Sequence, residues 1–544
     1  MYFNRLLSYH RSTKLCVSCA TSMLQRRSIV TSMSNTLKIK EFSSRVGGQN
    51  VPLIGGKWYI MQSLFSKSPR QSEVRNFCMS SNNKPSKYIR KLNHVEVMFD
   101  RFTELGYCNS MAGLPIKSTV EITEDMLREA MNRLRKEHVA LRSQIDIAYD
   151  KDDKETGRYY VEMENGGFVD VKTSRATSDE IDVAMCEEGK FPLKSNKNSL
   201  WRCILLKGHW VRDVNNGLKV YKTGIIMMMN HAFVDGLGFI RYNQLLLEKL
   251  DEVVGNKPMP KTIAFESAPF PRPIQSLLSS EDAAFVFQDE GKVNDGVSNS
   301  LNIQNASVET KYLNIEIPRE LMLGLKNTSH KHGGSLNSAL IAVYCLAYIK
   351  VMNNAKVTDR QSLAIGLAAS LKRYFTERDI PDLGMYVCSL WFNIDIATNQ
   401  FEGKGVWKLA NKIARDIRKQ LYDKSQGLSN IKKSSVNVFL KTILDKIKDI
   451  NNFKRNPLDL YISNMAYESW KFPEFRNFTL ESFFCGNTGT VNNFGILTFM
   501  LSDKLIIIIQ YDTEMISSDT AKLYKNEIET ILKELSIVIE RSEF

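Results

Sequence analysis

The stretch NHAFVDGLG, residues Asn230–Gly238, joins two segments of contrasting pattern. The segment before it, Leu218–Met229, is rich in residues that favour β-structure and ends in five consecutive large apolar residues, which predicts a buried strand. After it, apolar residues recur at helical spacing from Leu237 to Leu250 and predict an amphipathic helix of about four to five turns. The order is therefore strand, turn and helix, and a side chain on such a turn can face a cleft.

The turn carries the arrangement His-x-x-x-Asp-Gly at His231, Asp235 and Gly236. Imidazole accepts a proton near neutral pH at its ordinary pKa, so His231 is a candidate general base. Asp235 lies too far around the turn to be assumed a direct proton relay, and it is expected to pair with an arginine and hold the turn in shape. The alternative is structural: a buried His231 bonded to backbone groups, and Asp235 capping the helix that follows. The residues alone leave both interpretations open.

Strands and helices alternate on both sides of this turn. Thr123, followed by two acidic residues, has the pattern of a helix N-terminus, and this helix is expected to end near His138. Further helices are predicted over residues 336–351 and 518–539. Strands are predicted at Leu141–Tyr149, Arg158–Val171, Trp201–Lys207, Lys311–Ile317, Ser362–Leu367, Gly384–Ile396, Asp459–Met465, Gly495–Leu501 and Lys504–Tyr511. This alternation predicts an α/β protein with two lobes.

The 544 residues divide into four stretches by composition. Residues 1–86 are expected to form a largely disordered basic presequence, 87–266 an N-terminal lobe, 267–309 a crossover linker and 310–544 a C-terminal lobe. Residues 1–93 hold 16 of the 73 Lys and Arg residues but only two of the 60 Asp and Glu residues, and the first 40 residues contain no acid. This composition is typical of a transit peptide and predicts mitochondrial localisation, with a cytoplasmic protein carrying a basic tail as the alternative.

The composition also argues against several classes of function. Because the basic excess is confined to the N-terminal stretch, the remainder is nearly neutral, and nucleic-acid binding is not supported. No apolar run reaches the roughly 18 residues that a membrane span needs, so no transmembrane segment is predicted. Nine cysteines at irregular spacing do not predict a disulfide framework, and no metal site is predicted. The glycine-rich phosphate-binding motifs of nucleotide hydrolases and dinucleotide enzymes are absent from the sequence.

The turn and four further segments carry a resemblance to a known family. NHAFVDGLG resembles the motif of the chloramphenicol-acetyltransferase-like superfamily, and most closely that of the alcohol O-acetyltransferases and the condensation-type acyltransferases. Similar segments follow in the family's order, at Lys136–Arg142 (KEHVALR), Gly384–Asn393 (GMYVCSLWFN), Ser463-Asn464 and the closing hairpin Asn493–Asp512. The resemblance covers about residues 88–540.

The resemblance implies two pseudo-symmetric lobes with a tunnel between them. His231 would stand in the middle of this tunnel as general base. Asp235 would point away from the substrate and form an ion pair with an arginine. Arg142 is the first candidate, because it occupies the family's Leu-Arg position, and Arg373 is the second.

Three more residues receive roles by the same resemblance. Gly236 would allow close backbone packing at the tunnel wall, and Ser463 and Asn464 are candidate contacts to a substrate or an oxyanion. The sequence departs from the family pattern at two places. Asn230 stands where many condensation enzymes have a first histidine, and Ala466 stands where the alcohol acetyltransferases have the glycine of Ser-Asn-x-Gly.

The activity that the resemblance implies is an acyl-CoA-dependent O-acyltransferase. It would be a monomer without a bound cofactor, moving an acyl group from the co-substrate acyl-CoA to the hydroxyl group of a small alcohol or other acceptor. A first alternative is a condensation-type acyltransferase that takes its acyl group from a carrier protein and forms an amide or an ester. A second is a non-catalytic protein of the same fold that binds an acyl ligand or a partner.

Overall fold

In the computed structural model the chain divides into two units, residues 1–82 and Asn83–Phe544. The structure describes residues 87–104, 106–153, 155–163, 171–191, 193, 199–213, 217–257, 268–287, 309–352, 360–376, 383–397, 404–423, 428–429, 458–470, 472–489, 492–501 and 504–542, all within the second unit. The basic stretch 1–86 lies outside the described residues, so its role in targeting stays a prediction.

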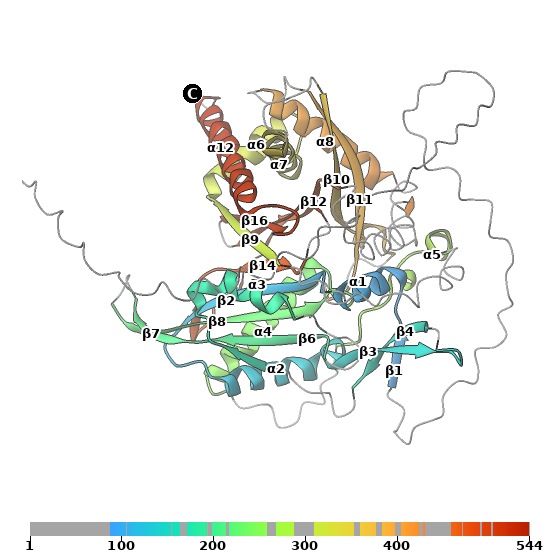
Figure 1. Ribbon diagram of the computed structural model, residues 1–544, viewed down its shortest axis with the longest axis vertical. Helices are drawn as coiled ribbons and strands as arrows, with labels where there is room; N and C mark the ends of the chain where they lie inside the picture. The colour runs from blue at the N-terminus through green and yellow to red at the C-terminus, as the bar shows by residue number, and fades with distance from the viewer. Residues whose placement is uncertain are drawn as a thin grey trace, which may run out of the picture. The chain divides into compact units, whose positions relative to one another are not determined.

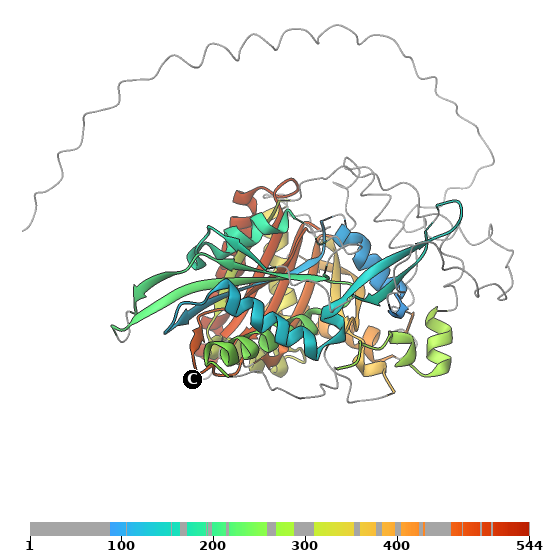
Figure 2. The same cartoon turned by 90° about the horizontal axis from the view of Figure 1, so that it is seen from below.

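A seven-stranded sheet forms the N-terminal lobe, in the order β13-β2-β8-β6-β5, with β14 paired to β2 and β7 paired to β8. Its strands are β2 (Asn109–Ser118), β5 (Val171–Ser174), β6 (Trp201–Leu206), β7 (His209–Arg212), β8 (Lys219–Asn230), β13 (Phe478–Leu480) and β14 (Phe484–Asn487). Helices α2 (Glu124–Glu137) and α4 (Gly236–Val254) lie side by side on one face (Figure 2). Helix α3 (Ile181–Gly189) packs on the opposite face (Figure 1).

Strand β8 is buried on both faces of this sheet. Ile225, Met227 and Met229 belong to the core beneath α2 and α4. Ile226 and Met228, which alternate with them, belong to the core beneath α3. A strand covered on both sides needs an uninterrupted apolar run because successive side chains point to opposite faces. The buried strand predicted before the histidine turn is therefore confirmed.

The C-terminal lobe is built on a six-stranded sheet in the order β11-β10-β12-β15-β16-β9. Its strands are β9 (Thr310–Ile317), β10 (Arg360–Ser370), β11 (Val387–Ala397), β12 (Leu460–Trp470), β15 (Phe494–Leu501) and β16 (Lys504–Asp512). One face of this sheet is covered by the helices α6 (Arg319–Lys331), α7 (Leu336–Met352), α8 (Lys404–Tyr422) and α12 (Ser518–Ser542) (Figure 1). Every residue of α7 from Ser338 to Ile349 is at most 4% exposed, as expected of a helix that is apolar on all sides.

Two strands from the C-terminal part of the chain join the sheet of the N-terminal lobe and so connect the lobes. Strands β13 and β14 come from the C-terminal part of the chain, yet both pair with β2 of the N-terminal sheet. A smaller sheet of order β1-β4-β3 flanks that lobe, together with helix α1 (His94–Glu104). Its strands are β1 (Lys87–Lys91), β3 (Ser143–Tyr149) and β4 (Glu155–Glu162). Within the described ranges no single helix has both the length and the apolarity to cross a bilayer, and α6 and α7 reach that criterion only as a pair bent by 99°.

Several sequence predictions hold at the level of single residues, and one does not. The side chain of Thr123 caps α2 by accepting a hydrogen bond from the backbone N–H of Met126 (3.3 Å), as predicted. The single strand predicted over Arg158–Val171 is wrong, because β4 ends at Glu162 and β5 begins only at Val171. The stretch 267–309 includes a short helix, α5 (Ser280–Phe287), and its residues 288–308 lie outside the described part of the chain.

Candidate active site

His231 lies on the turn between β8 and α4, as the sequence predicted. Strand β8 ends at Asn230, and α4 begins at Gly236. Between them Asp235 is extended (φ −88°, ψ −178°) and caps the helix, because its Oδ1 accepts a hydrogen bond from the N–H of Gly238 (2.9 Å). The strand end thus fixes the backbone before the histidine, and the helix start fixes the backbone after it.

The imidazole of His231 is nearly buried and packs against an aromatic ring. The residue is 9% exposed, and Phe99 of α1 stacks on it with ring centroids 4.3 Å apart and planes inclined by 21°. Its Nδ1 is buried and makes no hydrogen bond within the described part of the chain. Burial lowers the pKa of His231 to about 4, although the carbonyl groups of His231 itself and of Val234 favour the charged ring. The ring is therefore neutral at neutral pH.

Asp235 connects the turn to the C-terminal lobe. Its Oδ2 accepts a hydrogen bond from the N–H of Tyr386 (3.1 Å), and its own N–H donates to the carbonyl of Gly384 (3.0 Å). Both partners belong to the segment GMYVCSLWFN, whose resemblance to the family was noted from the sequence. Burial raises the pKa of Asp235 to about 6, although the N–H groups of Gly238 and Tyr386 and the charge of Lys372 favour the ionised carboxylate.

The ion pair expected between Asp235 and Arg142 is wrong. Arg142 pairs instead with Glu162 of β4 (2.5 Å) and also donates to carbonyl groups at the end of α2. The second candidate, Arg373, donates to a backbone carbonyl, and among the residues that the structure describes no arginine pairs with Asp235. The physical reason is that backbone N–H groups at the helix start and at Tyr386 already bind both carboxylate oxygens. The helix-capping alternative for Asp235 is the one that the structure confirms.

A cavity of about 140 Å³ lies beside the start of α4, with walls from both lobes. Its lining residues are Asp235, Gly236, Leu237, Asn337, Leu367, Ala368, Ala369, Ser370, Arg373, Val387, Ile417, Leu421, Ser463, Asn464 and Met465. The cavity thus brings Ser463 and Asn464 next to the Asp235-Gly236 end of the motif. His231 is not among the lining residues within the described ranges. A continuous tunnel that reaches the imidazole therefore stays a prediction.

Two contacts shape the wall of this cavity. Asn464 of β12 donates from Nδ2 to Oδ1 of Asn337 in α7 (2.8 Å), which joins two elements of the C-terminal lobe. A Cβ atom on Gly236 would lie 2.9 Å from Sδ of Met465, closer than real Cβ atoms approach their neighbours. Glycine therefore lets the start of α4 pack closely on β12, which fits the role expected of Gly236.

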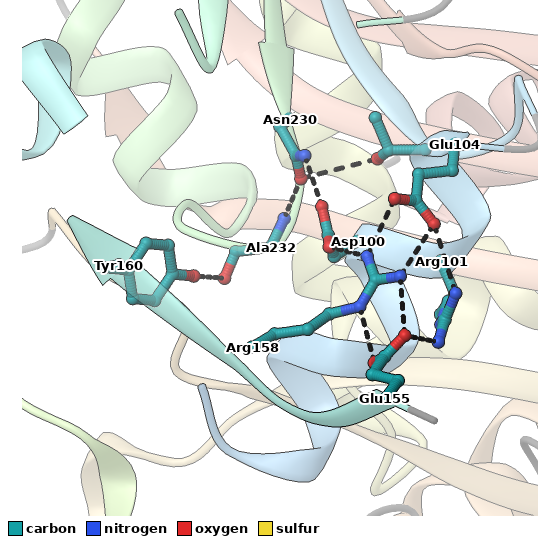
Figure 3. A network of polar contacts seen from close by, with 9 residues as sticks. Asp100, Arg101, Glu104, Glu155, Arg158, Tyr160, Asn230 and Ala232 are labelled. Atoms are coloured by element: carbon teal, nitrogen blue, oxygen red, sulfur yellow. Dashed lines mark hydrogen bonds and ion pairs between the residues drawn. The ribbon is translucent and has the colours of Figure 1, made fainter. Parts of the chain in front are cut away.

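Among the residues beside the turn that were not predicted from the sequence are Phe99 and Asp100 of α1 and Arg158 of β4. Asp100 is fully buried, forms an ion pair with Arg158 and accepts a hydrogen bond from Nδ2 of Asn230 (3.0 Å), as Figure 3 shows. One signal was present in the sequence. Asn230 stands where the family motif has a histidine, and its buried amide needs both a hydrogen-bond donor and an acceptor nearby. The sequence does not show which residues supply them.

The side chains of the turn can take part in proton transfer and hydrogen bonding. Across the described ranges, no group of three or more His, Cys, Asp or Glu residues is arranged to hold a metal ion. Cys388, at the end of β11 nearest the Asp235 contact, is buried, and burial raises the pKa of its thiol to about 12. That thiol is therefore not a thiolate nucleophile near neutral pH. On the turn, His231 and Asp235 are both in their base forms near neutral pH, and the two carboxylate oxygens of Asp235 already accept hydrogen bonds from backbone N–H groups.

Neither the family models nor the curated proteins give a match to this sequence. Solved structures match over most of the chain. The trichothecene 15-O-acetyltransferase TRI3 from Fusarium sporotrichioides is 12% identical, with a TM-score of 0.58 over 82% of this chain and 94% of that one. The condensation domain of the Monacolin K polyketide synthase MokA is 11% identical, with a TM-score of 0.55 over 83% of this chain and 97% of that one.

A third neighbour was solved with a thioester ligand. It is a mutant starter condensation domain of rhizomide synthetase RzmA in complex with C8-CoA, 13% identical, with a TM-score of 0.50 over 82% of this chain and 95% of that one. At such identities the likeness is one of fold. The two-lobed architecture expected from the sequence is confirmed: the chain has the chloramphenicol-acetyltransferase-like fold of these acyltransferases and condensation domains.

Proposed function

We propose that this protein is an acyl-CoA-dependent O-acyltransferase with His231 as its general base. One observation carries the proposal: the His-x-x-x-Asp-Gly turn is held at the junction of the lobes, beside a cavity lined by both of them, in a chain with the fold of acyltransferases. The choice of a hydroxyl acceptor and a CoA donor draws on neighbours described as an O-acetyltransferase and as a complex with C8-CoA.

In the proposed reaction the neutral imidazole of His231 takes the proton of the acceptor hydroxyl as that oxygen attacks the thioester carbonyl. A tetrahedral oxyanion forms and collapses, the C–S bond breaks, and the imidazolium returns its proton to the departing CoA thiolate. The products are an ester and free CoA, and no acyl-enzyme forms. Ser463 and Asn464 line the cavity and are proposed to contact the substrate or the oxyanion. A pKa near 4 keeps His231 in the base form at neutral pH.

The test is release of CoA thiol when the purified protein is mixed with acetyl-CoA or longer acyl-CoA and a panel of alcohols. His231→Ala should lower kcat by roughly 10²–10⁴-fold, because it removes the base. His138→Ala is the matched control: His138 is also buried, and burial also lowers its pKa to about 4, but it lies at the end of α2 against Tyr242. The control should keep its kcat, and an equal loss in both variants would contradict the role of His231.

The pH dependence gives a second check on the same base. A histidine whose pKa is lowered in the native protein stays neutral until the pH falls to that lowered value. We therefore expect kcat/KM to decline with falling pH only as the solution approaches about pH 4. An acid limb centred near the ordinary histidine pKa of about 6.5 would contradict the proposed environment of the ring.

A specific observation favours a second candidate, a non-catalytic protein that binds an acyl ligand. The imidazole of His231 is stacked on Phe99 and 9% exposed, and within the described ranges it does not line the cavity where a substrate would bind. The same assay separates the candidates. A rise in Tm with acyl-CoA, without thiol release from acyl-CoA or from an acyl carrier protein, would favour the binding protein. Turnover with the carrier thioester alone would favour the carrier-dependent enzyme.

A further inference from the structure

The turn that bears His231 is backed by a buried cluster of charged residues. Arg158 of β4 is 1% exposed and forms an ion pair with Asp100, which is fully buried. Arg158 also donates to Glu104 (3.0 Å) and to Glu155 (3.0 Å), and Arg101 pairs with Glu155 (Figure 3). Burial opposes the charge of Arg158, but these carboxylates raise its pKa overall, so it remains a cation.

Asn230 connects this cluster to the histidine turn. Its Nδ2 donates to Oδ1 of Asp100 (3.0 Å), and its Oδ1 accepts from the N–H of Ala232 (2.8 Å). The Asn230 amide therefore spans His231, with one end on the charged cluster and the other on the residue after the histidine. Tyr160 of β4 donates to the carbonyl of Ala232 (2.9 Å) and so holds the next peptide group, between Ala232 and Phe233. The backbone on both flanks of the imidazole is fixed by side chains of α1 and β4.

We propose that Asp100 and Arg158 are positioning residues for His231, acting through Asn230. The inference rests on the proposed function, because it assigns these residues to the orientation of the base in that reaction. Neither residue contributes a proton or contacts the reacting atoms. Arg158 orients the carboxylate of Asp100, that carboxylate orients the amide of Asn230, and the amide sets the turn on which the imidazole is placed over Phe99.

Burying ions is a costly way to gain stability alone, because desolvation offsets most of the attraction between them. A buried charged pair does impose direction on its hydrogen bonds, since a carboxylate only accepts and a guanidinium only donates. This direction decides which end of the Asn230 amide faces Asp100 and which end faces the N–H of Ala232. The asparagine that replaces the first histidine of the family motif thus has one defined orientation.

The direction of these hydrogen bonds allows a swap experiment. In Asn230→Asp an oxygen replaces the donor that faces Asp100, so two carboxylates oppose each other. In Asp100→Asn the amide must turn its NH₂ group either to Asn230 or to Arg158, and both are donors. In the double variant an amide at position 100 can accept from Arg158 and donate to a carboxylate at position 230, so every hydrogen bond is restored with the donor and acceptor exchanged.

We expect each single substitution to lower kcat by about 10²-fold with little change in KM, because misplacing a catalytic group by about 1 Å costs that much. The double variant should recover most of the loss. Asp251→Asn is the matched control: Asp251, near the far end of α4, also accepts from an asparagine amide, that of Asn477 (3.1 Å). This control should keep its kcat.

A readout independent of turnover keeps the inference separate from the proposed function. The pKa of His231 is followed by NMR of ¹³C-labelled histidine, with its signal assigned by His231→Gln. In each single variant the pKa should rise from about 4 towards the ordinary value of about 6.5, because a loosened turn admits water, and it should fall again in the double variant. This result supports the positioning role even where no acyl transfer is found.

Three outcomes would overturn the inference. The first is a single variant that loses stability but keeps both the kcat and the His231 pKa of the native protein, because the cluster would then stabilise the lobe without orienting the base. The second is a double variant that recovers neither the native kcat nor the native His231 pKa. The third applies if Asn230→Asp does not fold: Asp100→Asn that keeps the native His231 pKa then overturns the inference. In that case a folded double variant with the native His231 pKa supports it.

Discussion

The two sides of the histidine turn are held by different chemistry. Before His231, Asn230 is anchored on Asp100 and Arg158, a charged pair contained within the N-terminal lobe. After His231, the carboxylate of Asp235 accepts hydrogen bonds from backbone N–H groups, and one of these belongs to Tyr386 of the other lobe. The difference separates two tasks: the charged side orients the imidazole, whereas the side held by backbone groups joins the lobes at the cavity.

The largest effect on stability is expected on the charged side. Arg158→Met should lower the free energy of unfolding by about 3–5 kcal/mol, because it leaves Asp100 as a buried charge without its partner. Urea denaturation at neutral pH measures this. Lys504→Met is the control, since Lys504 and Glu316 form an exposed pair (2.9 Å) and such pairs contribute little. Equal, small losses in both variants would show that Asp100 and Arg158 are not a buried ionic anchor.

A smaller effect, with a defined pH dependence, is expected on the backbone-held side. Asp235→Ala should cost about 1 kcal/mol at neutral pH through loss of the helix cap. The native pKa of Asp235 is raised to about 6, so between about pH 4 and pH 6 the native state holds a proton that the unfolded state has lost. The contribution of Asp235 to stability is therefore largest at low pH and declines as the pH rises through 6.

The measurement is the difference in the free energy of unfolding between native protein and Asp235→Ala, at about pH 4.5 and at about pH 7.5. We expect this difference to be larger at the lower pH by about 2 kcal/mol, since one unit of pKa shift corresponds to about 1.4 kcal/mol. A difference that grows as the pH rises would mean that Asp235 is ionised and paired, as the resemblance had implied.

The part of the site that follows local sequence rules was predictable. The apolar run of β8, the helical spacing of α4 and the cap pattern at Thr123 are short-range signals, and all three elements formed as predicted. The family resemblance added the two lobes and their order. It also supplied the one pairing that proved wrong, because Arg142 was placed by its position in a motif and not by any physical partner.

The part that depends on long-range contacts could not be read from the chain. Helix α1 has 11 residues, and its Phe99 and Asp100 gain their roles through contacts with residues more than 50 positions away along the chain. Strands β13 and β14 are three and four residues long and pair with β2, across more than 350 positions. Such short segments carry little pattern of their own, and the sheet that accepts them decides their structure.

The smallest effect on stability is expected where the backbone-held side meets the cavity. Gly236→Ala places a Cβ atom 2.9 Å from Sδ of Met465, so that side chain must move. Methionine is flexible, and alanine favours the helix, so the free energy of unfolding should change by less than about 1 kcal/mol. Because Met465 lines the cavity, its displacement should raise KM for acyl-CoA more than it lowers kcat. A fall in kcat with unchanged KM would instead place Gly236 with the groups that orient His231, and the division between the two sides of the turn would fail.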